Sequence, residues 1–190
     1  MKNGRSFIQQ ASQITPHKPI IVHKVGRFAS GRQAAASHTG ALAGSESAFD
    51  AAFRRAGVIR AASSEEQFDW AQALAWCPLP QGRNVAVLTN AGGPGVTAAD
   101  ALESHNLHLA PLHADTLAQL EAILPPFASL HNPVDMLASA SPNEYAHCLQ
   151  ILLADEQVHS VMVVLPPPPM FSAGATAQAL IPSSPLPPNR

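Results

Sequence analysis

Residues 84–95 read NVAVLTNAGGPG, and this run decides the fold class. Residues 84–89 form a continuous apolar run with branched side chains, which is typical of a buried strand in a parallel sheet. A glycine-rich turn follows at 90–95, and residues 96–104 are predicted to form a helix with Pro94 near its first turn. The order strand, glycine turn, helix predicts an α/β fold.

The sequence on either side of this run continues the alternation. We predict helices at residues 4–14, 45–56, 63–76, 115–124 and 142–154, from apolar positions at helical spacing and from capping residues. We predict strands at residues 19–22, 58–60, 107–109 and 158–165. Alternating strands and helices imply a parallel sheet with helices on both faces.

The segments without a periodic pattern divide the chain. A break at residues 78–82, which contains Pro78 and Pro80, separates an upstream from a downstream unit. Residues 24–44 contain four glycines and predict a long loop, and long loops inside compact domains are usually functional. Residues 166–169 and the tail at 183–190 are rich in proline, so we expect a disordered end.

The composition argues against several classes of function. Charged residues make up 13% of the chain and its formal net charge is -2, so nucleic acid is not expected as a partner and no polybasic membrane anchor is present. No run is long enough to span a membrane. Cys77 and Cys148 are isolated and the nine histidines are scattered, which indicates neither a disulfide framework nor a metal site. We therefore expect a cytoplasmic protein.

The turn at 90–95 is a candidate phosphate cradle. Glycines at positions 92, 93 and 95 let the backbone approach an anion, while the following helix offers unpaired N–H groups and the positive end of its dipole. The run lacks the Lys-Ser/Thr ending of a Walker loop and does not match GxGxxG in register. A tight turn that needs glycine only for packing is the alternative.

His38 is the second candidate for phosphate chemistry. A neutral imidazole is a competent nucleophile toward a phosphoryl group, because free histidine titrates near roughly 6.5. Gly40 leaves room for a phosphate on the ring, and the hydroxyls of Ser37 and Thr39 can donate to its oxygens. Considered alone, a histidine in a loop is more often a surface residue.

Five segments together resemble a known family. They are KPIIVHKVGR at 18–27, SHTGALAG at 37–44, FDAAFRRAGV at 49–58, LTNAGGPG at 88–95 and HNPVDM at 131–136. In order and spacing these segments are similar to acetate-CoA ligase (ADP-forming) and its relatives, over about residues 2–182. These proteins belong with the succinyl-CoA synthetases, so the resemblance implies flavodoxin-like domains.

The resemblance assigns roles to particular residues. It implies that His38 is the phosphorylated histidine, with Ser37, Thr39 and Gly40 around its phosphate, and that Asn90, Gly92, Gly93 and Gly95 form the entrance of a helix that holds this phosphate. The implied reaction makes an acyl phosphate from acyl-CoA and phosphate, and moves the phosphoryl group to histidine and then to ADP. Asp135 receives no chemical step and is expected to cap or fix its turn.

The resemblance also predicts what the chain lacks. Residues 1–78 correspond to the C-terminal part of a first flavodoxin-like unit, and residues 83–182 to an incomplete second unit. The CoA-binding and ATP-grasp domains are expected in a partner domain or subunit, in either a homo-oligomer or a hetero-oligomer. CoA, ATP or ADP, Mg²⁺ and a small carboxylic acid would then serve the complete enzyme, and none is expected to bind tightly to this chain alone.

Three interpretations follow from this departure. The first is a segment of a ligase. It belongs to an enzyme family, but by itself it is expected to be inactive. The second is a non-enzymatic interaction module that assembles with separate CoA-binding and nucleotide-binding partners. The third is the ligase-like region of a protein lysine acetyltransferase, against which the retention of His38 argues.

Overall fold

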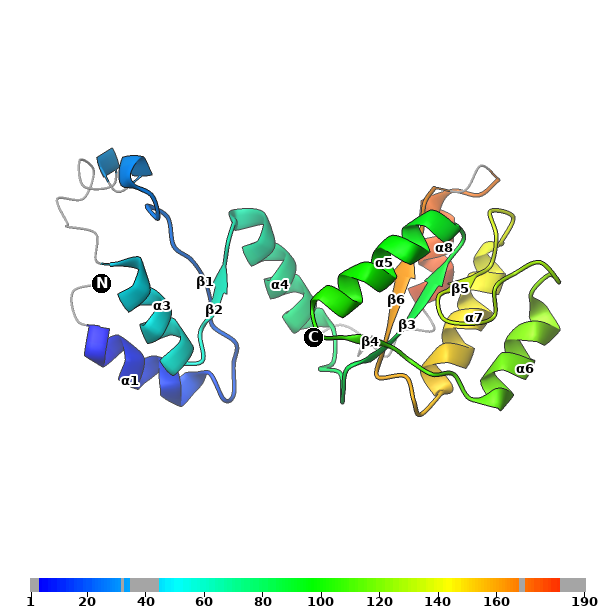
Figure 1. Cartoon of the computed structure of the whole chain (residues 1–190), viewed down its shortest axis with the longest axis horizontal. Coiled ribbons are helices and arrows are strands. Elements are labelled where there is room, and N and C mark those ends of the chain that lie inside the picture. The colour runs from blue at the N-terminus through cyan, green and yellow to red at the C-terminus, as the bar shows by residue number, and fades with distance from the viewer. Residues whose placement is uncertain (1–3, 32, 35–44, 168–169, 182–190) are drawn as a thin grey trace. The chain divides into compact units, whose positions relative to one another are not determined.

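The computed structural model describes residues 4–31, 33–34, 45–167 and 170–181. The chain forms two compact units, Met1–Pro78 and Leu79–Arg190, and each is built on its own parallel sheet (Figure 1). The expected α/β class with parallel sheets is confirmed. Within these described residues, every helix is too short or too polar to cross a membrane.

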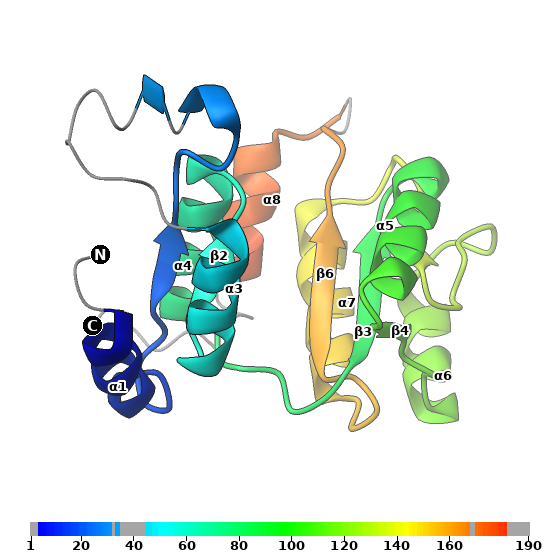
Figure 2. The same cartoon turned by 60° about the vertical axis from the view of Figure 1, so that its left-hand side comes forward.

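The first unit is a two-stranded sheet with helices on both faces. Strand β1 (Ile21–His23) pairs in parallel with β2 (Ile59–Ala61), and Ile21 lies opposite Ile59. Helices α1 (Gly4–Ile14) and α3 (Glu46–Arg55) pack together on one face, where Ala11, Phe53, Ala56 and Val58 form the buried cluster. Helix α4 (Ser64–Trp76) covers the other face and has no buried residue (Figures 1 and 2).

Capping residues set the helix ends of this unit. The Ser45 hydroxyl accepts a hydrogen bond from the Ala48 amide at the start of α3, and the Ser63 hydroxyl accepts one from the Glu66 amide at the start of α4. Gly57 ends α3 with a φ of +66°, a left-handed conformation that glycine adopts at little cost. These are the ends that the sequence predicts.

The second unit is a four-stranded sheet centred on β3 (Asn84–Thr89). Strand β6 (Ser160–Val164) pairs with β3 from Val85 to Thr89. Strand β4 (His108–Leu109) pairs with the start of β3 and strand β5 (Val134–Asp135) with its end. Because β6 already occupies one edge of β3, β4 and β5 lie one after the other along the opposite edge.

Side chains of β3 alternate between two apolar layers. Val85 and Val87 pack with Ala98 and Leu102 of helix α5 (Gly92–Ser104). The other face holds the larger cluster, which includes Ala86 and Leu88, and it is covered by α6 (Ala114–Ile123) and α7 (Pro142–Ala154) (Figure 2). Helix α8 (Ala173–Leu180) packs against α7. Strand β3 ends at Thr89, and α5 begins shortly after it at Gly92.

The sequence-based predictions are wrong at four places. Strand β5 and helix α8 were not expected, and residues 29–31 and 33–34 are helical within the predicted loop. The small side chains there permit a helical turn, and Ser172 caps α8 by accepting from the Ala175 amide. Helix α5 begins at Gly92, so the cradle glycines belong to its first turn. The expected disordered tail at 183–190 lies outside the described residues.

Candidate phosphate-binding site

The start of α5 leaves backbone N–H groups available. Ala91 is the N-cap, with extended φ and ψ of −153° and 127°, and its own side chain makes no capping hydrogen bond. The first amides of a helix have no partner within the helix, and the helix dipole places partial positive charge beside them. Phosphate oxygens accept hydrogen bonds from such free amides, so the N-terminus of α5 is suited to bind an anion.

The glycines of the first turn differ in what surrounds them. A Cβ on Gly95 would lie 3.2 Å from Thr89 Cγ2 and 3.4 Å from Pro133 Cβ, so a larger residue would force these neighbours to move. A Cβ on Gly92 would lie 3.3 Å from an Asp135 carboxylate oxygen. Gly93 has no other atom within 4 Å of that position. The helix is thus held closely at Gly92 and Gly95 and is open at Gly93.

Two polar side chains fix the turn between β3 and α5. The Thr89 hydroxyl accepts a hydrogen bond from the Ala91 amide at 3.2 Å. Asn90 is 4% exposed, and its Nδ2 donates to the Pro166 carbonyl at 3.3 Å. The Asn90 Oδ1 is buried and has no hydrogen-bond partner among the described residues. Asn90 therefore belongs to the framework that joins β3 to the residues after β6.

Asp135 fixes the turn after β5, as the sequence predicts. Its Oδ1 accepts a hydrogen bond from the Leu137 amide at 2.9 Å, and Leu137 has a φ of 68°. The Asp135 backbone exchanges two hydrogen bonds of 3.0 Å with Ser129. Burial raises the pKa of the Tyr145 hydroxyl, and the charge of Asp135 raises it further. This carboxylate lies beside the first turn of α5.

The predicted histidine segment lies outside the described residues. Ser37, His38, Thr39 and Gly40 all fall within residues 35–44, which the structure does not describe. Their roles therefore stay predictions. Charged side chains from the described residues before and after this segment contact one another.

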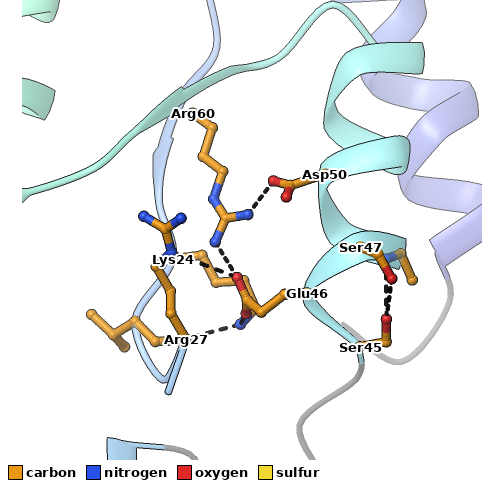
Figure 3. Close-up of polar contacts among 9 residues, drawn as sticks. Lys24, Arg27, Ser45, Glu46, Ser47, Asp50 and Arg60 are labelled. Atoms are coloured by element: carbon orange, nitrogen blue, oxygen red, sulfur yellow. Dashed lines mark hydrogen bonds and ion pairs between the residues drawn. The ribbon is translucent and has the colours of Figure 1, made fainter.

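A cluster of charged side chains forms around Glu46, from residues that precede and follow that segment in the sequence (Figure 3). The Glu46 carboxylate, at the start of α3, bonds Lys24 Nζ at 2.5 Å and Arg60 Nη2 at 2.5 Å, and it lies 3.8 Å from Arg27 Nε. Arg60 also bonds Asp50. Hydrogen bonds from Arg60 and Lys24 lower the pKa of Glu46 from 4.5 to about 2. Sequence reasoning missed this cluster.

A buried carboxylate lies in the other unit. Asp155 accepts hydrogen bonds from the His113 amide at 2.9 Å, from His113 Nδ1 at 2.7 Å, from the Thr116 hydroxyl at 2.6 Å and from the Gln157 amide at 2.9 Å. Burial alone would raise the pKa of Asp155, but these hydrogen bonds outweigh burial and hold it well below its usual range. Asp155 thus ties the start of α6 to the end of α7.

The described part of the chain offers no cluster of metal ligands. No group of three or more His, Cys, Asp or Glu side chains comes together there. His113 and Asp155 form a pair only.

Comparison with known proteins places this geometry in a family. The family described as succinyl-CoA ligase like flavodoxin domain matches residues 1–74, and the Ligase-CoA domain matches residues 85–179. The alpha subunit of acetate-CoA ligase (ADP-forming) I from Pyrococcus furiosus is 46% identical over 167 residues. The chain belongs to the NDP-forming acetate-CoA ligase family. The expected family is therefore confirmed.

Other members of the family agree. Acetate-CoA ligase (ADP-forming) I from Archaeoglobus fulgidus is 41% identical over 95% of this chain and 26% of its own length. The structure of a dinucleotide forming acetyl-coenzyme A synthetase from Ca. Korarchaeum cryptofilum, in complex with phosphate and ADP, superposes with a TM-score of 0.85 at 36% identity. The superposition covers 95% of this chain and 39% of the synthetase chain.

The chain corresponds to only part of each relative. The alignment with the Pyrococcus furiosus subunit covers 86% of this chain but only 35% of that subunit. The chain thus spans about a third of the curated alpha subunits that it matches.

Proposed function

We propose that this chain is the phosphohistidine segment of an ADP-forming acyl-CoA ligase. His38 carries the phosphoryl group, and the backbone donors at the start of α5 hold its oxygens. The observation that carries the proposal is the α5 terminus, where Ala91 makes no side-chain capping hydrogen bond and Gly93 is open, in a chain of this ligase family. Asn90, Gly92, Gly93 and Gly95 form that half of the cradle.

The proposed reaction moves one phosphoryl group in two steps. In the first, a ring nitrogen of His38 attacks the phosphorus of an acyl phosphate, the bond from phosphorus to the acyl oxygen breaks, and the carboxylate leaves. In the second, a terminal phosphate oxygen of ADP attacks the phosphohistidine, the N–P bond breaks, and ATP forms. His38 is restored at the end of the cycle.

The residues around His38 contribute position and charge stabilisation. Ser37 and Thr39 each supply a hydroxyl donor, and Gly40 leaves space for the phosphate. The N–H groups of α5 are fixed before the phosphoryl group arrives, so no reorganisation is needed as charge moves. Catalysis of phosphoryl transfer depends largely on such positioning.

The rest of the ligase is proposed to come from a CoA-binding domain and an ATP-grasp domain or subunit. The similar Pyrococcus furiosus proteins are named alpha subunits, and the chain spans about a third of them. We therefore assign residues 1–78 to part of a first flavodoxin-like unit and 83–182 to a second. A CoA-binding domain and an ATP-grasp domain would supply the sites for CoA, for ATP or ADP with Mg²⁺, and for a small carboxylic acid, in the cytoplasm.

Reconstitution tests the proposal. We would mix the chain with polypeptides that carry the CoA-binding and ATP-grasp domains, and measure ATP formed from acetyl-CoA, phosphate and ADP. The wild-type mixture is expected to form ATP, His38→Ala is expected to abolish it, and His105→Ala is the control that keeps it. Activity retained by His38→Ala, or no activity in the wild-type mixture, would contradict the proposal.

A further inference from the structure

The segment at residues 131–136 received no role from the sequence beyond fixing a turn, yet Asn132 lies at a gap in the sheet. Strand β4 pairs with β3 at Asn84 and Val85, and β5 pairs with it at Leu88 and Thr89. Between these points, none of the strands in the described part of the chain reaches this edge of β3. The Val85 carbonyl already accepts a hydrogen bond from the Ala110 amide at 2.9 Å. The Val87 amide needs another partner, because buried peptide groups are almost always hydrogen-bonded.

The side-chain amide of Asn132 fills this gap. Its Oδ1 accepts a hydrogen bond from the Val87 amide at 2.8 Å, and its Nδ2 donates to the Val85 carbonyl at 2.8 Å and to the Ala110 carbonyl at 3.1 Å. One amide thus does what a peptide group of a continuous strand would do. It also ties β3 to the residue after β4.

The residues that follow Asn132 touch the start of α5. Pro133 Cβ lies 3.4 Å from the position that a Cβ on Gly95 would occupy, and an Asp135 carboxylate oxygen lies 3.3 Å from the position that a Cβ on Gly92 would occupy. The Met136 amide donates to the Thr89 carbonyl at 2.8 Å, which holds β5 on β3. The position of this short segment therefore limits where the first turn of α5 can lie.

We propose that Asn132 is a positioning residue for the phosphate cradle. Asn132 does not touch the phosphoryl group. It anchors the segment whose Pro133 and Asp135 place the N–H groups of α5. The proposal rests on the proposed function, because it names what holds the cradle that receives the phosphate.

The alternative is that Asn132 only stabilises the sheet. Phosphate affinity separates the two roles when it is measured on folded protein. A residue that only stabilises the sheet lowers the folded fraction and leaves the affinity of the folded chain unchanged. A positioning residue lowers that affinity as well, because displaced donors bind less well.

The test titrates inorganic phosphate into the full chain and follows the amide resonances of Gly92 and Gly93 by NMR. Asn132→Ala is expected to weaken phosphate binding about tenfold and to shift these resonances before phosphate is added. Leu120→Ala, a core variant on α6 that is also destabilised, is the control and is expected to bind as the wild type does. Asn132→Asp keeps an acceptor for the Val87 amide and loses both donated hydrogen bonds. It replaces Asn132→Ala in the titration if that variant does not fold.

Two results would overturn the inference, and they are distinguishable. If both Asn132 variants bind phosphate with wild-type affinity, Asn132 is structural only, while the proposed function stands. If the wild-type chain neither binds phosphate nor shows shifts at Gly92 and Gly93, the cradle itself is wrong, and the positioning role falls with it.

Discussion

The two units of the chain are held together by different interactions. In the described residues, the first unit has two strands and a buried apolar cluster of four residues, and its strands and helix α3 are joined by the ion cluster around Glu46. The second has four strands and a buried cluster of eleven residues that includes Leu88, Leu120 and Tyr145. Apolar packing dominates the second unit, and charged contacts carry more of the first.

The units also carry opposite charge. Residues 1–78 contain nine Lys or Arg and five Asp or Glu, whereas residues 79–190 contain two Lys or Arg and eight Asp or Glu. One of those two cations, Arg83, directly precedes β3, whereas the cradle follows the other end of this strand. A six-residue strand spans about 20 Å, so Arg83 is separated from the cradle by the length of β3. The proposed cradle therefore depends on backbone donors, and cationic side chains gather in the unit that contains His38.

The largest expected effect tests the packing of the second unit. Leu120→Ala removes a fully buried side chain and is expected to lower the free energy of unfolding by about 2–5 kcal/mol. Near-UV circular dichroism of Tyr145, the only tyrosine, follows this unit during urea unfolding. Leu153→Ala, at a position that is 38% exposed, is the matched control with a smaller loss. Equal losses would contradict a packed core at Leu120.

A smaller effect is expected from the buried carboxylate of the same unit. Asp155→Asn keeps the shape but loses the charge that four donors stabilise, so we expect a loss of about 2 kcal/mol at neutral pH. The folded-state pKa of Asp155 is lowered, so its contribution is present above the ordinary value of 3.8 and is lost as the pH falls below it. Asp115→Asn, exposed in the first turn of α6, is the control.

The smallest effect tests the ion cluster of the first unit. Glu46→Gln is expected to lower the thermal midpoint at neutral pH, because three cations lose their shared carboxylate. The Glu46 pKa is about 2, so its contribution is present above its ordinary value of 4.5 and is lost as the pH falls toward 2. Fluorescence of Trp70 and Trp76, the only tryptophans, follows this unit. The same acid sensitivity in Glu46→Gln would contradict the assignment, and Glu65→Gln is the exposed control.

Features encoded by neighbouring residues could be predicted from the sequence. The apolar run at 84–89 and the glycines after it predict β3 and the start of α5, because a buried strand and a close backbone approach require those residue types. Ser45, Ser63 and Gly57 predict helix ends for the same local reason. The family resemblance added the flavodoxin-like character of the two units and their order.

Features that join distant residues could not be predicted. Strand β5 has only two residues, and its edge of the sheet is completed by the Asn132 side chain, which produces no alternating pattern. Lys24, Glu46 and Arg60 are far apart in sequence, so their cluster is visible only in the folded unit. The role of His38 stays a prediction, because it falls in residues 35–44.

Phosphorylation of His38 tests the central claim most directly. The chain would be incubated with ATP labelled in its γ-phosphoryl group and with a polypeptide that carries an ATP-grasp domain. We predict that the chain acquires an acid-labile, base-stable label, that His105→Ala retains it, and that His38→Ala loses it. Label that persists in His38→Ala, or a wild-type chain that acquires none, would contradict the account.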